Sequence, residues 1–226
     1  MIKAVIFDMF ETLVSLFEGR TFFSEDMAQA AGTDPETFRA VWHGTEHDRS
    51  TGRITVEEGI AVTLRTLGLY SEEKVKEIAA GRQAALADTF AAIPLASVKL
   101  LEELRARGIL IGLISNAYYD ERDFIRGCAL FPFFDAVRIS CEQGVCKPDP
   151  DMYLSVMEEL GIQACECLYV GDGGSRELFT AEALGMKAVQ AVWFRDRAFA
   201  PHVPCPLFEE FPHAACQGDI PDLLYQ

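Results

Sequence analysis

Positive charge is scarce in this sequence. Its 226 residues include 20 lysines and arginines against 35 aspartates and glutamates, a formal net charge of −15. A surface this acidic repels nucleic acids and anionic membranes at long range. A small phosphorylated molecule stays possible as a ligand, because a metal ion and a few cations can reverse the field inside a cleft. The composition therefore predicts a small-molecule ligand and argues against nucleic-acid and membrane partners.

Two further features are missing. No apolar run approaches the roughly 18 residues that a membrane span needs, and no basic, apolar signal segment precedes the first apolar run at the start of the chain. The seven cysteines contain no paired CxxC knuckle of the kind that holds structural zinc. These absences predict a cytoplasmic protein with reduced thiols.

Short apolar runs alternate with segments of helical periodicity over much of the chain. Runs rich in β-branched and aromatic residues suit strands that are buried on both faces. The predicted strands are 3–7, 109–114, 136–139, 167–170 and 187–192, and the predicted helices between them are 97–107, 151–160 and 175–184. This rhythm predicts the α/β class, with a doubly wound, Rossmann-like parallel sheet between two layers of helices.

Residues 14–92 break the rhythm. They contain no convincing buried strand but several helix starts, such as the capping-box pattern from Thr55 to Glu58. An all-helical block of this size can close over the C-terminal edge of the sheet. We therefore predict a catalytic core formed by residues 1–13 and 93–226, with an inserted helical cap at 14–92.

Polar residues follow four of the apolar runs or precede the helices after them. Open parallel sheets bind ligands beyond the C-terminal ends of their strands, so these residues are expected to meet at one edge. Carboxylates there can hold a divalent cation, while lysine, hydroxyl and backbone N–H groups can bind a phosphoryl group. The segments are Asp8 to Leu13, Ser115-Asn116, Lys147-Pro148 and Gly171 to Glu177.

In this order and spacing, the four segments resemble the motifs of the haloacid dehalogenase superfamily, and 14–92 stands where many members carry a helical cap. The resemblance implies a Mg²⁺-dependent hydrolase that forms a covalent intermediate on Asp8. It implies catalytic roles for Asp8, Ser115 and Lys147, phosphate or substrate contacts from Thr12, Ser115, Asn116 and Lys147, and a metal site formed by Asp8, the Phe10 carbonyl, Asp172 and Glu177.

One position departs from the family's usual pattern. Most phosphatases of this superfamily carry a second aspartate two residues after the nucleophile, where it protonates the leaving oxygen, but this chain has Phe10. The substrate could have a good leaving group, as an acyl phosphate does, or the proton could come from another residue. The candidates for that proton are Glu11, Glu18, His43, His47 and Arg49.

Phe10 is also compatible with two different functions. The 2-haloacid dehalogenase branch, which the chain resembles at Lys147 and Tyr153, has an aromatic residue at this position. A protein that binds a phosphorylated ligand with little turnover would not need the proton donor either. The carboxylates of Asp172 and Glu177 favour phosphatase chemistry, because they would repel each other and an anionic substrate unless a cation lay between them.

Two surface features complete the prediction. Residues 49–53 are expected to form a polar loop between two cap helices, where Arg49 and Arg53 could contact an anionic substrate or only solvent. Phe131, Phe133 and Phe134 are expected to pack against the sheet, whereas an exposed cluster would indicate a dimer surface. The chain is therefore expected to be a monomer or a homodimer.

Overall fold

A computed structural model describes residues 1–197 and 207–225. Six strands form one sheet in the order β3-β2-β1-β4-β5-β6, and every neighbouring pair is parallel. The predicted α/β class with a doubly wound parallel sheet is confirmed. The strands are β1 (Ala4–Phe7), β2 (Leu110–Ser115), β3 (Ala136–Ile139), β4 (Cys167–Gly171), β5 (Lys187–Ala191) and β6 (His213–Ala214).

Strand β1 occupies the centre of the sheet. All four of its residues are buried, as expected for an uninterrupted apolar run covered on both faces. Its first residue, Ala4, pairs with Leu110 of β2 on one side and with Cys167 of β4 on the other. The strand order reverses direction between β1 and β4, and open α/β sheets bind their ligands at such a reversal.

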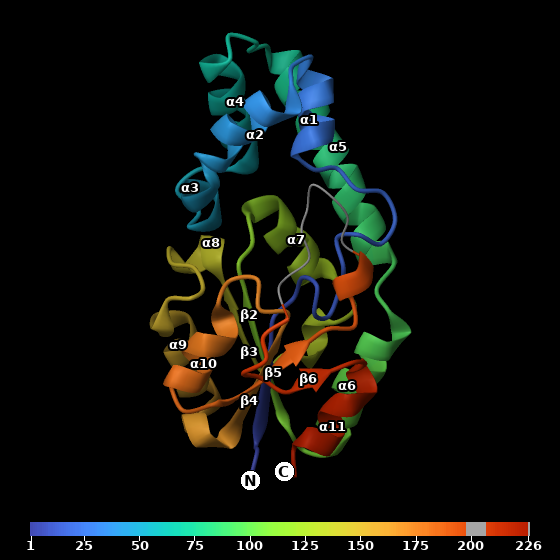
Figure 1. The fold of residues 1–226 in the computed structure, drawn as a ribbon, viewed down its shortest axis with the longest axis vertical. Coiled ribbons are helices and arrows are strands. Elements are labelled where there is room, and N and C mark those ends of the chain that lie inside the picture. The colour runs from blue at the N-terminus through green and yellow to red at the C-terminus, as the bar shows by residue number, and fades with distance from the viewer. Residues whose placement is uncertain (198–206, 226) are drawn as a thin grey trace.

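Helices cover both faces of the sheet (Figure 1). Leucines of α6 and isoleucines of α7 and α11 pack on one face, while apolar residues of α9 and α10 pack on the other. The phenylalanines at 131, 133 and 134 pack partly buried against the first of these cores, as predicted. The helices of this sheet lobe are α6 (Leu95–Ala106), α7 (Tyr119–Gly127), α8 (Ser140–Gln143), α9 (Pro150–Leu160), α10 (Glu177–Ala183) and α11 (Ile220–Leu223), with short 3₁₀ turns at Phe131–Phe133, Ala164–Glu166, Arg195–Arg197 and Gln217–Asp219.

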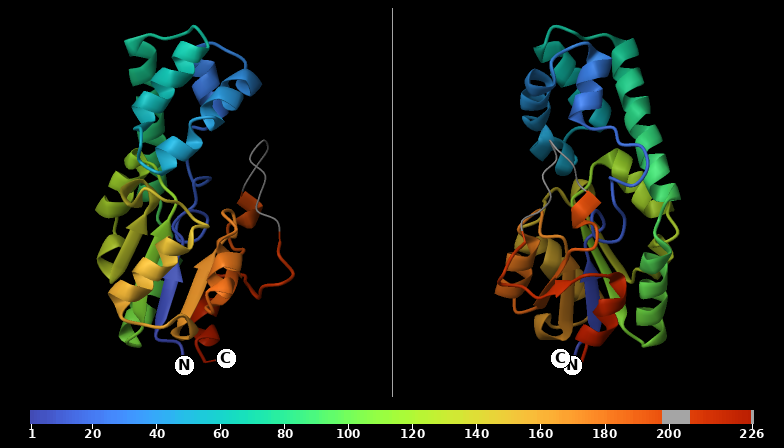
Figure 2. Two further views of the ribbon diagram at one scale, coloured as in Figure 1. Left: turned by 90° about the vertical axis from the view of Figure 1, so that its left-hand side faces the viewer. Right: turned by 45° about the vertical axis from the view of Figure 1, so that its right-hand side comes forward.

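A second group of helices forms a separate lobe beyond the C-terminal ends of the strands (Figures 1 and 2). It has its own apolar core, with Phe38 fully buried and Trp42 beside it. Thr55 and Glu58 form the predicted capping box at the start of α4. This helical lobe (residues 24–91) consists of α1 (Ser24–Ala31), α2 (Pro35–His43), α3 (Glu46–Ser50), α4 (Val56–Thr66) and α5 (Glu72–Ala91). That residues 14–92 act as a cap stays a prediction.

The two lobes contact each other on opposite sides of the molecule. Helix α5 runs down from the helical lobe and packs along α7. On the opposite side, the turn after α3 lies against α8, and the hydroxyl of Tyr119, the first residue of α7, donates to the Gly52 carbonyl at 3.3 Å. Gly52 has a φ of +70°, and a Cβ there would lie 2.0 Å from the Cys141 carbonyl oxygen. Only glycine permits this close approach.

Some predicted boundaries were wrong by about one or two residues, as is usual at frayed element ends. The last predicted helix of the core begins at Glu177 instead of residue 175, because Arg176 adopts a left-handed backbone conformation with φ of 55°. The polar loop predicted at 49–53 was partly wrong as well. Arg49 and Ser50 belong to α3, so only the residues from Thr51 onward form the turn.

No single helix among the described residues has both the length and the apolar composition to cross a membrane. The bent pair formed by α5 and α6, which meet at 58°, passes this test on length and composition alone.

Close packing between β2 and α9 gives a test of the fold. A Cβ on Gly112 would lie 2.9 Å from Val156 Cγ1 and 3.1 Å from Ile6 Cγ1. We predict that Gly112→Ala lowers the free energy of unfolding in urea by about 1–3 kcal/mol, because the extra methyl overpacks this core. Gly127→Ala is the matched control, since a Cβ there meets nothing within 4 Å. Equal stability of the two variants would contradict the packing.

Candidate active site

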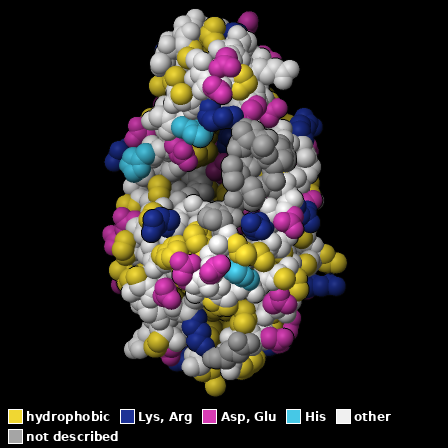
Figure 3. Space-filling model, in the orientation of Figure 1, with side chains coloured by type: hydrophobic (Ala, Val, Ile, Leu, Met, Phe, Trp, Pro, Cys, Tyr) yellow, Lys and Arg dark blue, Asp and Glu magenta, His cyan; other side chains and the backbone are white. Residues whose placement is uncertain are grey.

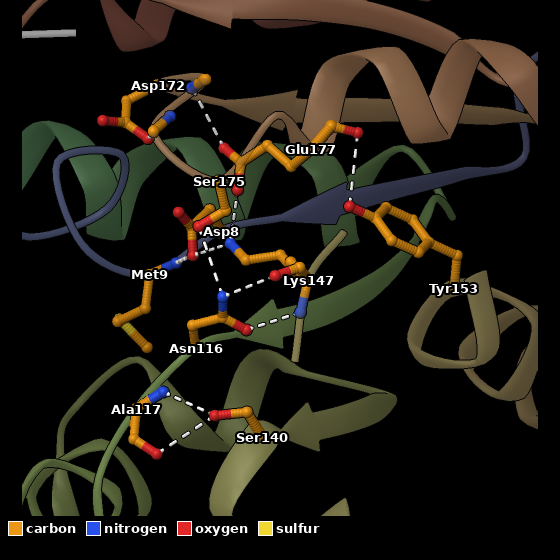
Figure 4. Close-up of polar contacts among 12 residues, drawn as sticks. Asp8, Met9, Asn116, Ala117, Ser140, Lys147, Tyr153, Asp172, Ser175 and Glu177 are labelled. Carbon is orange, nitrogen blue, oxygen red and sulfur yellow. Dashed lines mark hydrogen bonds and ion pairs between the residues drawn. The ribbon is translucent and has the colours of Figure 1, made fainter. Parts of the chain in front are cut away.

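Asp8 lies directly after β1, at the centre of the C-terminal edge of the sheet. It is only 7% exposed. Its Oδ1 accepts a hydrogen bond from the backbone N–H of Met9 at 2.7 Å and forms an ion pair with Lys147 Nζ at 2.6 Å (Figure 4). The second oxygen, Oδ2, makes no hydrogen bond or ion pair with the other described residues. It is therefore available for a ligand or for attack.

The ammonium of Lys147 lies between two carboxylates. Besides Asp8, it contacts Glu177 Oε2 at 2.5 Å, and its side chain is 1% exposed. Burial works to lower the pKa of Lys147, but the two carboxylates outweigh it and raise this pKa above its ordinary value. Lys147 is therefore a fixed positive charge at neutral pH.

Two carboxylates follow β4. Asp172 comes directly after the strand, and its Oδ1 accepts from the Gly174 N–H at 3.0 Å. Glu177 begins α10, and its Oε1 accepts from the Gly173 N–H at 3.1 Å. Carboxylate oxygens of Asp8, Asp172 and Glu177 lie within 4.8 Å of one another, so one ion could contact all three.

Asn116 joins three of the strand-end segments. Its amide donates to the Lys147 carbonyl at 3.0 Å and to the Ser175 hydroxyl at 3.3 Å, while its oxygen accepts from the Lys147 N–H at 2.7 Å. Asn116 thus uses both ends of its amide to fix the backbone of the lysine segment. Its side chain holds the site together, and that it also contacts a substrate stays a prediction.

Two hydroxyls of the predicted site residues are buried without a hydrogen-bond partner among the described residues. They belong to Ser115, the last residue of β2, and to Thr12. Both residues are fully buried. Leaving a buried hydroxyl unpaired costs about 1–3 kcal/mol, so such groups point to a ligand or water that completes them. This is the arrangement expected if both hydroxyls bind the oxygens of a bound group.

Three carboxylates of the site lie close to one lysine. Asp8, Asp172 and Glu177 supply three carboxylates, and Lys147 supplies one cation within contact of two of them. Burial and the charge of Glu177 raise the pKa of Asp8 well above its ordinary value, although Lys147 opposes the shift. A divalent cation would offset the repulsion among the three carboxylates, and a set of carboxylate oxygens suits Mg²⁺ or Ca²⁺.

Phe10 faces the helical lobe. Its ring packs edge-to-face on Phe90 of α5 with centroids 6.2 Å apart, and Phe90 stacks on Phe124 of α7 at 5.7 Å. The position where most phosphatases of the superfamily carry a proton donor therefore makes an aromatic contact between the lobes. That the Phe10 carbonyl binds metal stays a prediction.

The residues predicted as alternative proton donors differ in their surroundings. Both carboxylate oxygens of Glu11 are engaged, by the Ser15 hydroxyl and the Leu16 N–H at 2.8 Å each, and burial raises the pKa of Glu11 to about 7. Glu18 pairs with Arg197. His43 and His47 lie exposed on the helical lobe. None of these contacts directs a proton toward Asp8.

Arg49 is enclosed in the structure. It is 0% exposed, with its guanidinium 3.3 Å from the ring centroid of Trp42 and 4.4 Å from that of Tyr118. Its Nε donates to the Thr45 hydroxyl and its Nη2 to the Trp42 carbonyl, each at 3.0 Å. The predicted substrate contact from Arg49 stays a prediction, and in this structure the side chain packs between the lobes.

Two serines at the site were not predicted from the sequence. Ser140 follows β3 and holds the Ala117 backbone, accepting from its N–H at 3.0 Å and donating to its carbonyl at 3.2 Å (Figure 4). Ser175 accepts the bond from Asn116. Ser140 comes directly after a predicted strand, and this position could have identified it. Nothing in the sequence distinguishes Ser175 from its glycine-rich surroundings.

Gly171 gives a test of the carboxylate cluster. A Cβ on this last residue of β4 would lie 2.1 Å from Glu177 Oε1. We predict that Gly171→Ala displaces the Glu177 carboxylate from Lys147 and lowers the affinity for Mg²⁺ about 10–100-fold, as measured by calorimetry. Glu177→Gln should give a similar loss. Unchanged affinity in both variants would mean that Glu177 has no part in metal binding.

Curated relatives of this chain include several phosphatases. A phosphoserine phosphatase of Thermus thermophilus is 34% identical over 105 residues, covering 46% of this chain and 41% of that protein. N-acylneuraminate-9-phosphatase of Homo sapiens is 31% identical over 127 residues, covering 55% and 49%. The chain thus spans less than half the length of these two. A phosphatase of Mycobacterium tuberculosis is 28% identical over 178 residues and covers 76% and 79%.

Solved structures with the same fold include a 2-haloacid dehalogenase of Pseudomonas syringae, with a TM-score of 0.69, 21% identity and coverage of 100% of this chain and 99% of that one. At this identity the likeness shows the fold alone. The sequence of residues 2–185, well over half of the chain, matches the family described as haloacid dehalogenase-like hydrolase. Together with the fold and the motifs at its strand ends, this match places the chain among the haloacid dehalogenase-like hydrolases.

Proposed function

We propose that this protein is a Mg²⁺-dependent phosphatase that acts on a small phosphorylated metabolite through an aspartyl-phosphate on Asp8. The observation that carries the proposal is the cluster of carboxylates around Asp8, in which oxygens of Asp8, Asp172 and Glu177 lie within 4.8 Å of one another and Lys147 contacts Asp8 and Glu177. Such a cluster is stable at neutral pH once a divalent cation is bound.

The carboxylates of Asp8 and Asp172, the Phe10 carbonyl and Glu177 would hold the ion, with Glu177 in contact directly or through water. When bound, Mg²⁺ supplies positive charge that lowers the pKa of Asp8 and neutralises the phosphoryl oxygens. The site's oxygen donors fit this ion, because Mg²⁺ binds through carboxylates and retains several waters.

Each residue of the site has its own role in the proposed reaction. Asp8 Oδ2 attacks phosphorus, a new O–P bond forms, and the bond to the leaving oxygen breaks. Lys147 and the hydroxyls of Ser115 and Thr12 stabilise the phosphoryl oxygens as charge shifts onto them. Water later attacks the same phosphorus and releases phosphate, which restores the Asp8 carboxylate.

Replacement of the nucleophile tests this proposal. We predict that the wild-type protein releases phosphate from an aryl phosphate when Mg²⁺ is present, and that Asp8→Asn lowers this rate by about 10³-fold or more, because an amide is a poor nucleophile. Phosphate release is measured with and without Mg²⁺, and EDTA should abolish it. If wild type and Asp8→Asn are equally inert on aryl, alkyl and acyl phosphates, a binding protein with little turnover becomes the better description.

Two residues favour a second candidate function, the dehalogenation of 2-haloacids. Phe10 supplies an aromatic residue two positions after Asp8, and Tyr153 is buried, with its hydroxyl donating to the Glu177 carbonyl at 3.3 Å. The solved 2-haloacid dehalogenase of Pseudomonas syringae shares this fold over the whole chain. Halide release from a 2-haloacid without Mg²⁺ would establish dehalogenation and exclude the phosphatase.

The missing proton donor gives a further prediction. Phe10→Asp should raise the turnover of alkyl phosphates, whose leaving oxygen needs a proton, by up to about 10²–10⁴-fold. Phe10→Asn is the matched control, because it also removes the contact with Phe90 but cannot supply a proton. Turnover of an aryl phosphate should change far less. An equal effect of both variants on alkyl phosphates would mean that the acid is supplied elsewhere.

A further inference from the structure

Arg82 of α5 joins the helical lobe to the sheet lobe through two carboxylates. Its Nε donates to Asp120 Oδ2 at 3.0 Å and its Nη2 to Glu121 Oε1 at 3.1 Å. All three side chains are buried, with exposures of 11%, 5% and 11%. Asp120 and Glu121 lie in the first turn of α7. One guanidinium therefore holds two adjacent carboxylates across the boundary between the lobes.

This contact is costly to break. Burial and the neighbouring Asp120 raise the pKa of Glu121, and Arg82 opposes that shift. Removing the arginine would leave two carboxylates side by side with little solvent. Moving the lobes apart would also leave the two carboxylates without their cation, unless water entered the gap. The ion pairs thus favour one placement of α5 against α7.

The space beside Arg82 does not suit a substrate. A pocket of about 30 Å³ lies next to it, lined mainly by apolar side chains of the two lobes. This volume holds a water molecule or two but no metabolite. Both carboxylates bound by Arg82 belong to the protein, so the cluster is already paired. Arg82 is therefore not arranged to bind an anionic ligand in addition to these carboxylates. Its contacts point to a role in positioning.

Hydrogen bonds and a short piece of backbone connect Arg82 to the candidate site. Glu121 uses its second oxygen, Oε2, to accept from the Tyr118 N–H at 2.9 Å. Tyr118 follows Asn116 and Ala117, the segment after β2. The side-chain amide of Asn116 in turn bonds both the N–H and the carbonyl of Lys147. The Glu121 carboxylate thus binds Arg82 of the helical lobe and also the start of α7, next to the segment that holds Lys147.

We propose that Arg82 is a positioning residue, which acts through Glu121 to hold the segment 115–118 and the helical lobe in the arrangement that binds the phosphoryl group. The identity of the bound group rests on the proposed phosphatase function. The ordering of the start of α7 by Arg82 is independent of that function. The coupling between Arg82 and the segment 115–118 is tested with two variants, because contacts alone do not establish energetic coupling.

The test compares a single with a triple substitution. Arg82→Met leaves two unpaired buried carboxylates and should lower the melting temperature. In Arg82→Met/Asp120→Asn/Glu121→Gln the charges are gone, while the amide of residue 121 can still accept from the Tyr118 N–H, so the melting temperature should recover. The KM for an aryl phosphate should stay raised about tenfold or more in both variants, with kcat changed less than about threefold.

Arg126→Met is the matched control. It removes an arginine of α7 that pairs with Glu142 of α8, so both partners belong to the sheet lobe, and their side chains are 45% and 19% exposed. Its KM should equal that of the wild type. A triple variant with both the melting temperature and the KM of the wild type would overturn the proposal, because Arg82 would then serve stability alone.

A second readout separates this proposal from the phosphatase function. Hydrogen exchange of the backbone amides at 118–122 should become at least about tenfold faster in both Arg82 variants and stay unchanged in Arg126→Met. If the wild type releases no phosphate from any ester, the proposed function fails, but this exchange result still decides the role of Arg82. Unchanged exchange in the triple variant would show that Arg82 does not order this segment.

Discussion

The ammonium of Lys147 lies inside the protein between the carboxylates of Asp8 and Glu177, and the rest of the site is arranged around this contact. A buried cation is tolerated only when anions surround it. The fold supplies these anions from the end of β1 and from the start of α10. The third carboxylate, Asp172, lies within 4.8 Å of the other two. The buried lysine contact therefore places the three carboxylates of the proposed metal site close together.

Much of this arrangement could be predicted because it follows from the topology of parallel sheets. Asp8 and Asp172 each come directly after an apolar run, and such residues meet at one edge of the sheet. Ser115 lies at the end of a predicted strand by the same rule. Glu177 was recognised only from the family resemblance, since no local pattern distinguishes it from any other glutamate at the start of a helix.

Contacts between the two lobes could not be predicted. Arg82 and its partners on α7 lie far apart in the sequence, and a charged residue on a helix is usually solvated. Arg49 looked like part of a polar loop, yet Trp42 and Tyr118 enclose it, because a guanidinium can stack on aromatic rings as well as bind anions. Such choices depend on how separate helices pack, which a local sequence pattern does not encode.

The central place of β1 also determines when the site can form during synthesis. This strand pairs with β2 and β4, so Ala4 needs Leu110 on one side and Cys167 on the other. A nascent chain that has emerged only as far as the helical lobe can already contain nearly all the residues of that lobe's core. Asp8 is made before the helical lobe, but β4 must also be made before the strand that precedes Asp8 is hydrogen-bonded on both sides. Asp8 is therefore made well before its neighbours in the site, Lys147, Asp172 and Glu177.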